Sequence, residues 1–299
     1  MRAHNLCYSS IVLEPQYAAL DGAQYTEVKT GLGTFKFAKV GGGGEHRGVL
    51  PALLEELTEY RKAARKKQRQ LADAGDHFGA SVANGAQLAY KVSSNSVYGF
   101  TGASKGFLPL PFIAASVTSI GRSMIEHTAA EVVRLNPGAR VIYGDTDSVM
   151  VILKVEGDNQ TDLRAHFELA ESVAATITEG FVAPIELEFE KCMYPYLLYK
   201  KKRYASFAYT SPEGPPKLDV KGIALVRRDY CALVKDVSQE ILDALLRDRS
   251  TEKALAAASR GVLRLLRGEV PLDKLTITKV RRHGKPEAGG WRPCLRRAD

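Results

Sequence analysis

The sequence has few of the features that mark secreted, membrane-spanning or zinc-binding proteins. Its 299 residues include four cysteines, which lie far apart and form no Cys-x-x-Cys pair. A disulfide scaffold and a cysteine-ligated metal site are therefore disfavoured, and reduced intracellular thiols are expected. No apolar run approaches the roughly 20 residues that span a bilayer, so we expect neither a signal peptide nor a membrane partner.

Two common ligand-binding patterns are also missing. The six histidines form no pair with metal-ligand spacing, which leaves a zinc or haem site without support. Residues 41–44 are four glycines, but no lysine and hydroxyl residue follow them as a Walker-type phosphate loop requires. This run is predicted to be a flexible linker.

The net charge of +8 is unevenly distributed. Lys279 and the residues after it hold seven lysines and arginines against two acids, or +5 of the total. The rest of the chain carries only +3, so an anionic partner has to be inferred from local clusters of charge.

The chain has the composition of a globular protein, with 45% hydrophobic and 25% charged residues. Helical periodicity begins at Val49, a turn is predicted at residues 73–79, and a second helix should run through Gln87 to about Tyr98 as a hairpin partner. Later segments predict an α+β fold with an antiparallel sheet. They are a helix within 109–133, strands at 139–143 and 149–155, a helix at 163–181, extended segments at 186–209, a turn at 212–216, and helices from Tyr230.

The strongest local feature is Tyr-Gly-Asp-Thr-Asp-Ser at residues 143–148, between two apolar segments. In a β-hairpin, residues two apart project to the same side, so Asp145 and Asp147 are expected to converge at one turn. Paired carboxylates repel each other unless a cation lies nearby, and such hard oxygen ligands suit Mg²⁺. Aspartate is also an ordinary turn residue, so the pair alone is compatible with a purely structural turn.

A second feature is Lys-Val-Ser-Ser-Asn-Ser-Val-Tyr-Gly at residues 91–99. In a helix, Lys91, Asn95 and Tyr98 share one face. Serine, asparagine and valine are mediocre helix formers, so something other than local propensity must favour them here. A lysine, an amide and an aromatic ring on one face would suit a nucleoside triphosphate, whereas a cap or turn cluster is the structural alternative.

Two basic clusters complete the set. Arg61 and Arg65 lie at i and i+4 on the predicted first helix, and guanidinium groups match phosphate oxygens. Residues 200–204 read Lys-Lys-Lys-Arg-Tyr, and four cations on a strand edge suit a nucleic-acid backbone, with Tyr204 as a flat contact. The alternatives are a solvated basic helix face, protection of a sheet edge, or a nuclear-import signal.

Taken together and in order, these motifs resemble the B-family DNA polymerases, and within that family the delta-type replicative enzymes. Residues 91–103 are similar to the second polymerase motif, residues 143–148 to the third, and residues 201–204 to the Lys-Lys-Arg-Tyr element that contacts the primer. The resemblance extends from residue 1 to about Lys279, with further matches at residues 47–51 and 226–229. It implies a DNA-directed DNA polymerase with a right-hand α+β fold.

The resemblance also implies a role for each candidate residue. Asp147 would bridge the metal ions beside Asp145, in a complete site that holds two Mg²⁺ ions. The triphosphate would be faced by Arg61, Arg65, Lys91 and Asn95. The nascent base pair would be packed by Tyr98 and Gly99. The primer would be contacted by Lys201, Lys202, Arg203 and Tyr204.

Substrates, partners and domains follow from the same resemblance. They are primer-template DNA, deoxynucleoside triphosphates and, for a full-length protein, a sliding clamp and accessory replication subunits in the nucleus. The implied domains are a partial palm at 1–45, a fingers hairpin at 46–104, palm at 105–230, and the start of a thumb with a divergent basic tail at 231–299.

The chain is expected to begin within or just after the family's first motif. It would then lack the aspartate that partners Asp147 and the tyrosine that excludes ribonucleotides, and the isolated chain is expected not to extend a primer. The alternatives are an inactive remnant that only binds DNA, an unrelated basic adaptor, and an RNA polymerase or reverse transcriptase. The pattern at residues 91–99 and the Lys-Lys-Arg-Tyr element favour a DNA polymerase.

Overall fold

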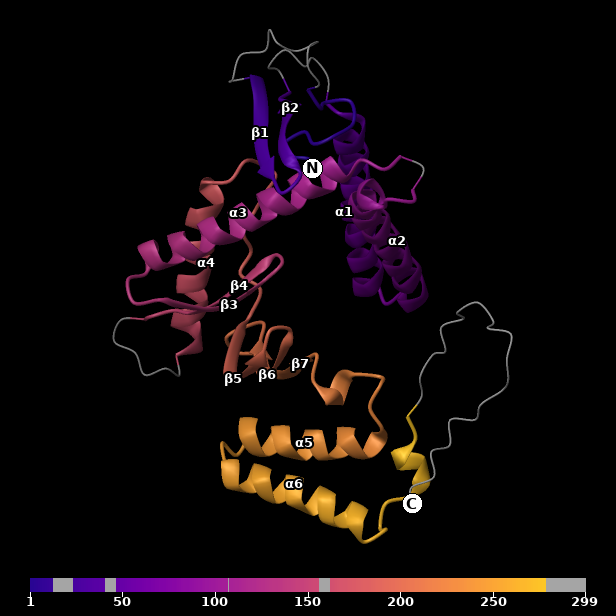
Figure 1. The fold of residues 1–299 in the computed structure, drawn as a ribbon, viewed down its shortest axis with the longest axis vertical. Coiled ribbons are helices and arrows are strands. Elements are labelled where there is room, and N and C mark those ends of the chain that lie inside the picture. The colour runs from indigo at the N-terminus through magenta and orange to yellow at the C-terminus, as the bar shows by residue number, and fades with distance from the viewer. Residues whose placement is uncertain (13–23, 41–46, 107, 156–161, 278–299) are drawn as a thin grey trace, which may run out of the picture. The chain divides into compact units, whose positions relative to one another are not determined.

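The computed structural model describes residues 1–12, 24–40, 47–106, 108–155 and 162–277 (Figure 1). Helices and small antiparallel sheets make up this part of the chain, which confirms the mixed α+β class. The chain divides into two compact units, Met1–Glu190 and Lys191–Asp299. This boundary falls within the segment 105–230, and the four-part domain division stays a prediction. The predicted glycine linker at 41–44 and the basic tail from Lys279 lie outside the described residues.

The first unit is built around helix α3. Its elements are β1 (Tyr25–Thr30), β2 (Gly33–Ala38), α1 (Val49–Asp73), α2 (His77–Gly102), α3 (Pro111–Leu135), β3 (Arg140–Asp145), β4 (Ser148–Ile152) and α4 (Leu163–Glu179). Near its start, α3 buries Ile113 against Phe37 of the β1–β2 hairpin. Near its end it buries Val132 with Ile177 of α4. One helix therefore links the two hydrophobic clusters of this unit.

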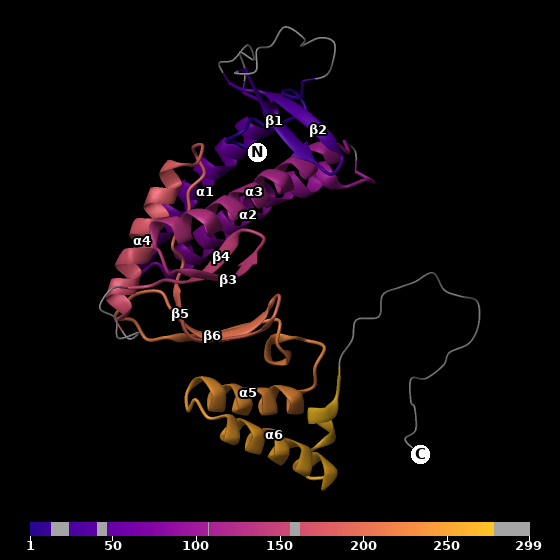
Figure 2. The same ribbon diagram turned by 60° about the vertical axis from the view of Figure 1, so that its left-hand side comes forward.

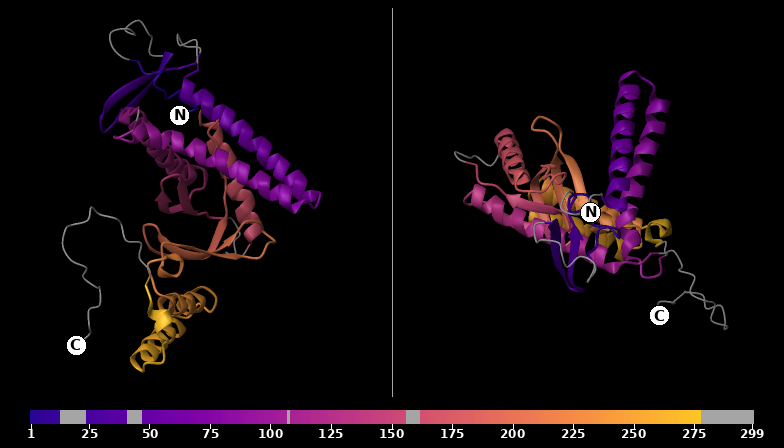
Figure 3. Two further views of the ribbon diagram at one scale, coloured as in Figure 1. Left: turned by 90° about the vertical axis from the view of Figure 1, so that its right-hand side faces the viewer. Right: turned by 90° about the horizontal axis from the view of Figure 1, so that it is seen from above.

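Helices α1 and α2 form the predicted antiparallel hairpin (Figure 3). The turn is shorter than predicted, because the Asp76 carboxylate accepts a hydrogen bond of 2.8 Å from the Gly79 N–H and starts α2 at His77. The less exposed residues of α2 recur every three or four positions along the side that packs on α1: Ala83, Gln87, Tyr90, Ser94 and Val97. This packing explains why residues 91–99 are helical despite their weak propensity.

The β3–β4 hairpin lies against α3 (Figure 2), and Val151 of β4 packs on the cluster that includes Val173 and Ile177 of α4. The predicted helix within 109–133 is confirmed, since α3 runs from Pro111 to Leu135 and Asn136 is its C-cap. The Asn136 side chain donates to the Lys154 carbonyl at 2.8 Å and accepts from the Lys154 N–H at 2.9 Å. The end of α3 is thus tied to the segment that follows β4, and this fixes the hairpin on its supporting helices.

The described part of the second unit, up to residue 277, has one meander and two α-helices. Its elements are β5 (Cys192–Lys200), β6 (Arg203–Tyr209), β7 (Lys217–Lys221), α5 (Ala232–Leu246) and α6 (Thr251–Leu266), with short 3-10 turns at Ala224–Val226 and Leu272–Leu275. The sheet order is β5-β6-β7, with both pairs antiparallel. Buried Ala205 and Phe207 of β6 pack on Leu242 and Leu246 of α5. This unit therefore has a hydrophobic core of its own.

The strands of the described residues form three separate small sheets rather than the one antiparallel sheet that the sequence predicted. The reason is that each ladder is made between neighbours in sequence, within a hairpin or a meander. Among the described helices, none has the length and apolar character needed to cross a membrane.

Candidate active site and nucleic-acid interface

The two aspartates of residues 143–148 lie at the end of the β3–β4 hairpin. Asp145 is the last residue of β3 and pairs with Ser148, so Thr146 and Asp147 alone form the connection. The Asp147 N–H donates to the Asp145 carbonyl oxygen at 2.6 Å, which closes a three-residue γ-turn around Thr146. Thr146 has a φ of +53°, an uncommon conformation for a β-branched residue. Alternation along the strand therefore sets the position of Asp145 only. The γ-turn keeps Asp147 next to Asp145.

The two carboxylates have different surroundings. Asp145 is half-buried, and its Oδ1 accepts a hydrogen bond of 3.0 Å from the Thr146 hydroxyl. The Ser148 hydroxyl donates to the Asp145 carbonyl at 3.1 Å, which further fixes the turn. Asp147 is exposed at the tip. Asp145 is thus held by its neighbours, while Asp147 faces solvent and is the more accessible ligand.

This donor set fits a hard divalent cation. Mg²⁺ is commonly held by one or two protein carboxylates, with waters and substrate phosphates in the remaining positions. No group of three or more His, Cys, Asp or Glu side chains that could hold a metal occurs among the described residues. The turn therefore offers part of a coordination shell and would depend on oxygen atoms from elsewhere to complete it.

Both helices of the α1–α2 hairpin carry basic residues close to the contact between Tyr60 and Tyr90. The rings of Tyr60 on α1 and Tyr90 on α2 lie 5.7 Å apart, so these residues meet across the hairpin. The following residue on each helix is rotated by about 100°. Lys91 is exposed, whereas Arg61 is half-buried and belongs with Leu57 and Gln68 to the less exposed row of α1. Arg65 and Asn95 lie one turn farther along their own helices, and both are exposed.

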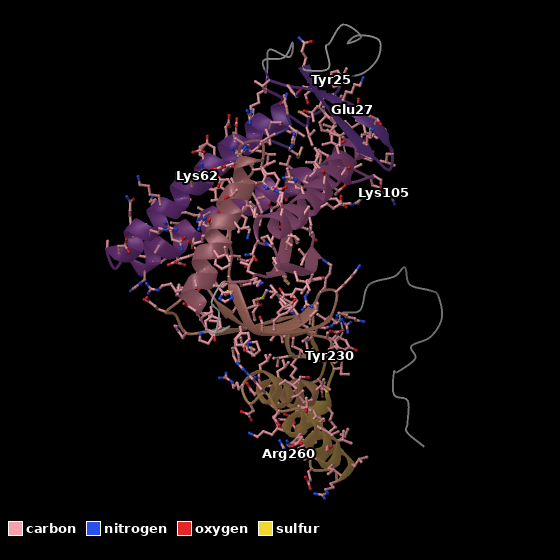
Figure 4. The ribbon with its side chains drawn as sticks, turned by 90° about the vertical axis from the view of Figure 1, so that its left-hand side faces the viewer. Tyr25, Glu27, Lys62, Lys105, Tyr230 and Arg260 are labelled. Carbon is pink, nitrogen blue, oxygen red and sulfur yellow. The ribbon has the colours of Figure 1, made fainter. Side chains whose placement is uncertain are left out.

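Arg61 and Arg65, at i and i+4 on α1, do not share one environment. Arg61 is half-buried, and its buried Nε has no hydrogen-bond partner within the part of the chain that the structure describes. Arg65 is exposed, and so is Lys62, whose side chain is 69% exposed (Figure 4). The Nε atoms of Arg2 and Arg47 are likewise buried without a partner, so this feature alone does not single out Arg61.

The predicted nucleotide face of α2 is solvent-exposed. Lys91, Asn95 and Tyr98 are all exposed, and 39% of the surface of Tyr98 is accessible to solvent. Gly99 is exposed as well, with no atom within 4 Å of the position that a Cβ would take. These side chains are open to a ligand because the half-buried Tyr90, Ser94 and Val97 occupy the packing side.

The basic residues of the second unit form a hairpin turn rather than a strand edge. Lys200 pairs with Arg203, so Lys201 and Lys202 are the two connecting residues between β5 and β6. Lys200, Lys201 and Lys202 are exposed, whereas Arg203 is half-buried. The difference from the sequence prediction arises because Lys202 adopts a φ of +61° and reverses the chain. Cations at a tight, exposed tip are well placed for phosphate contacts.

Tyr204 lies in a different environment from the lysines. It retains 8% of its surface, its ring lies 5.5 Å from that of Tyr196, and its backbone pairs with Lys221 of β7. This burial favours a packing role, and a contact of Tyr204 with DNA stays a prediction.

Sequence reasoning missed two residues that shape these turns. Thr146 carries the left-handed conformation of the aspartate turn, and Gly222 follows β7 with a φ of +64°. Glycine after a strand is a recognisable turn signal, but what approaches Gly222 depends on the tertiary structure. No sequence signal marks Thr146, because β-branched residues rarely adopt its conformation.

Comparisons with known proteins identify the family of the chain. The family described as DNA polymerase family B matches residues 1–287. The chain therefore belongs to the family B DNA polymerases, and at the level of family this excludes an unrelated adaptor, an RNA polymerase and a reverse transcriptase.

Its relatives include viral and cellular enzymes. The chain is 44% identical over 285 residues to a DNA polymerase of Paramecium bursaria Chlorella virus NY2A, covering 95% of this chain and 31% of that protein. It is 41% identical over 287 residues to the DNA polymerase delta catalytic subunit of Candida albicans, covering 94% and 26%. The corresponding subunit of Oryza sativa subsp. japonica is 43% identical over 287 residues, covering 93% and 25%. The chain thus spans about a quarter to a third of the length of these relatives.

Proposed function

We propose that this chain supplies the metal-binding turn, the nucleotide-binding helices and a primer-contacting turn of a DNA-directed DNA polymerase. The observation that carries the proposal is that residues 143–148, in a family B chain, form a closed hairpin turn with both aspartates at its end. Residues 46–104 would act as the fingers, 1–45 and 105–230 as the palm, and 231–299 as the start of the thumb.

Asp147 and Asp145 would hold magnesium. When bound, two Mg²⁺ ions would activate the primer 3′-hydroxyl and neutralise the leaving pyrophosphate. Asp147 is the stronger candidate for a direct ligand, because Oδ1 of Asp145 already accepts the Thr146 hydroxyl at 3.0 Å. The γ-turn holds both groups in place before substrate arrives, which reduces the reorganisation needed during the reaction.

The fingers hairpin would bind the incoming deoxynucleoside triphosphate. Lys91 of α2 and Arg61 of α1 would pair with the triphosphate oxygens. Arg65 and Asn95 are exposed one turn farther along their helices and would join them, and exposed Tyr98 and Gly99 would pack at the nascent base pair. The work of these residues is to position the substrate and stabilise its charge.

The Lys201–Lys202 turn would contact the primer backbone together with Arg203. Exposed lysines at a hairpin tip offer charge without base-specific readout, as a polymerase that copies any sequence requires. Because the chain is similar to delta-type enzymes, we expect the whole protein to bind a sliding clamp and accessory replication subunits and to be located in the nucleus.

The isolated 299-residue chain would be inactive in primer extension. In support, no further His, Cys, Asp or Glu joins Asp145 and Asp147 in a metal-binding group among the described residues. Such a chain would still bind DNA, which is the second candidate function and is favoured by the same Lys201–Lys202 turn. Mg²⁺-dependent incorporation by the purified chain would contradict this part of the proposal.

DNA binding by the purified chain tests the interface directly. Affinity for a primer-template duplex is measured over a range of salt concentrations, with Lys201 and Lys202 both replaced by alanine. If both lysines contact phosphates, the salt slope should fall by about two, since each contact contributes about 0.9. Lys67→Ala, which removes an exposed cation outside the proposed contacts, is the matched control. Equal slopes for the chain and the double variant would refute the assignment.

A further inference from the structure

Gly222 lies directly beneath the basic turn of the second unit. It follows β7 and has a φ of +64°, just beyond the β6–β7 pair Tyr204–Lys221. A Cβ on this residue would overlap the Lys202 carbonyl oxygen. It would also lie 3.2 Å from the Lys202 carbonyl carbon and from Cγ of Arg203. The nearest atom belongs to the backbone of the turn, so a movement of the Arg203 side chain would not relieve the overlap.

From this contact we infer that Gly222 is a positioning residue for the Lys201–Lys202 turn. Lys202 has a φ of +61°, and its carbonyl group rests where a side chain of residue 222 would otherwise stand. Only glycine allows this approach. Gly222 thereby sets the position of cations that would contact the primer, and in this respect the inference rests on the proposed function.

If residue 222 gains a side chain, the turn should move rather than the sheet. Strand β7 is held by five paired positions, from Ala208–Lys217 to Tyr204–Lys221. Its partner β6 is buried from Tyr204 to Ala208. The two turn residues, in contrast, are exposed. The displacement should therefore fall on Lys201 and Lys202.

Gly268 provides a matched control for backbone conformation. Its φ is +70°, close to that of Gly222, yet no atom lies within 4 Å of its Cβ position. Gly268→Ala therefore carries the same left-handed conformation without the collision. Gly222→Asn separates the backbone conformation from the collision in another way. Asparagine tolerates the left-handed conformation but still has a Cβ that would meet Lys202.

The experiment compares these variants in the 299-residue chain. DNA affinity is measured against salt, and hydrogen exchange is followed at the Lys202 and Arg203 amides. Gly222→Ala and Gly222→Asn should weaken binding roughly tenfold at low salt, lower the salt slope by about one to two, and speed exchange at the turn. Gly268→Ala should leave all three quantities at their original values.

The outcomes separate this inference from the proposed function. If the original chain does not bind DNA, or binds equally well without Lys201 and Lys202, the proposed interface fails, and exchange at the turn alone decides the role of Gly222. Unchanged exchange in Gly222→Ala, or full recovery in Gly222→Asn, would overturn the inference. Loss of the folded unit in both variants while Gly268→Ala folds would overturn it too, since the turn is then not the part that yields.

Discussion

Single residues in this chain are held by local contacts that determine their chemistry. Thr146 is the clearest example, because its φ of +53° and its hydroxyl contact with Asp145 define the aspartate turn. Strained backbone of this kind is concentrated at functional sites, where surrounding structure maintains it. The Tyr143–Met150 and Gly144–Val149 pairs supply that support here.

Asp219 on β7 is a second residue whose environment has a measurable consequence. Its carboxylate lies 2.8 Å from Nζ of Lys191 and 3.4 Å from Nζ of Lys221, and its side chain is 15% exposed. Burial alone would raise its pKa, but the hydrogen bond from Lys191 and the charges of both lysines outweigh that effect. The pKa of Asp219 is therefore lowered from the usual 3.8.

Asp219 should make the second unit less stable in acid. Because its pKa is lower in the folded state, its stabilisation is present above pH 3.8 and is lost as the pH falls through the folded value. We expect the difference in thermal midpoint between the original chain and Asp219→Asn to be largest near neutral pH and to shrink below about pH 4. Thermal unfolding from pH 7 to pH 2.5 measures this difference. A gap that stays constant over the whole range would argue against the ion pair.

Secondary-structure elements show where glycine is tolerated and where it is required. In α2, Gly85 is exposed, with no atom within 4 Å of its Cβ position. In α6, a Cβ on Gly261 would lie 2.5 Å from Cγ2 of Val237 on α5. Gly85 only lowers the helix propensity of α2, whereas Gly261 allows α5 and α6 to pack closely.

The same substitution should therefore have opposite effects at these two positions. Gly85→Ala should stabilise the protein by about 1 kcal/mol, since alanine is the better helix former. Gly261→Ala should destabilise it by about 1–3 kcal/mol through overpacking against a stiff β-branched side chain. Chemical unfolding of both variants provides the comparison. Effects of the same sign would contradict the packing described for α5 and α6.

The helices were predictable from sequence because their periodicity extends over many residues. The hairpin of α1 and α2 follows from helical periodicity and a turn segment, and α3 follows from the helix predicted within 109–133. The aspartate motif could be placed between two strands for the same reason.

Features that depend on contacts between distant residues could not be predicted. The partial burial of Arg61 requires α2 to be in place, and the approach of Lys202 to Gly222 requires β7 beside β6. The basic segment was predicted as a strand edge because nothing in four successive cations indicates that Lys202 reverses the chain. The register of a turn and the sign of its φ angles are set by the residues that contact it in the folded structure.

At the scale of the whole molecule, each unit has separate hydrophobic clusters. Leu6, Phe37 and Ile113 belong to one cluster of the first unit. In the second unit, Phe207 and Leu246 form one cluster, and Leu233 and Val270 belong to another. All the members of the last two clusters come from the second unit, so it contains the apolar contacts that a domain needs.

The second unit should consequently fold alone. Residues 191–277 expressed separately are expected to unfold cooperatively and to retain the near-ultraviolet signal of packed tyrosines. Circular dichroism during heating tests this expectation. A gradual transition without a packed aromatic signal would show that the unit depends on the remainder of the chain.

The most direct test of the account is the role of Asp147 in nucleotide transfer. The matched segment of the Chlorella virus DNA polymerase, 44% identical over 285 residues, can be replaced by this chain to give a complete enzyme. We predict Mg²⁺-dependent primer extension by the chimera and a loss on the order of 10³-fold in Asp147→Asn, about 4 kcal/mol of transition-state stabilisation. Asp73→Asn, at an exposed carboxylate that ends α1, is the control and should keep full activity. Extension by Asp147→Asn at the rate of the unaltered chimera would contradict the account.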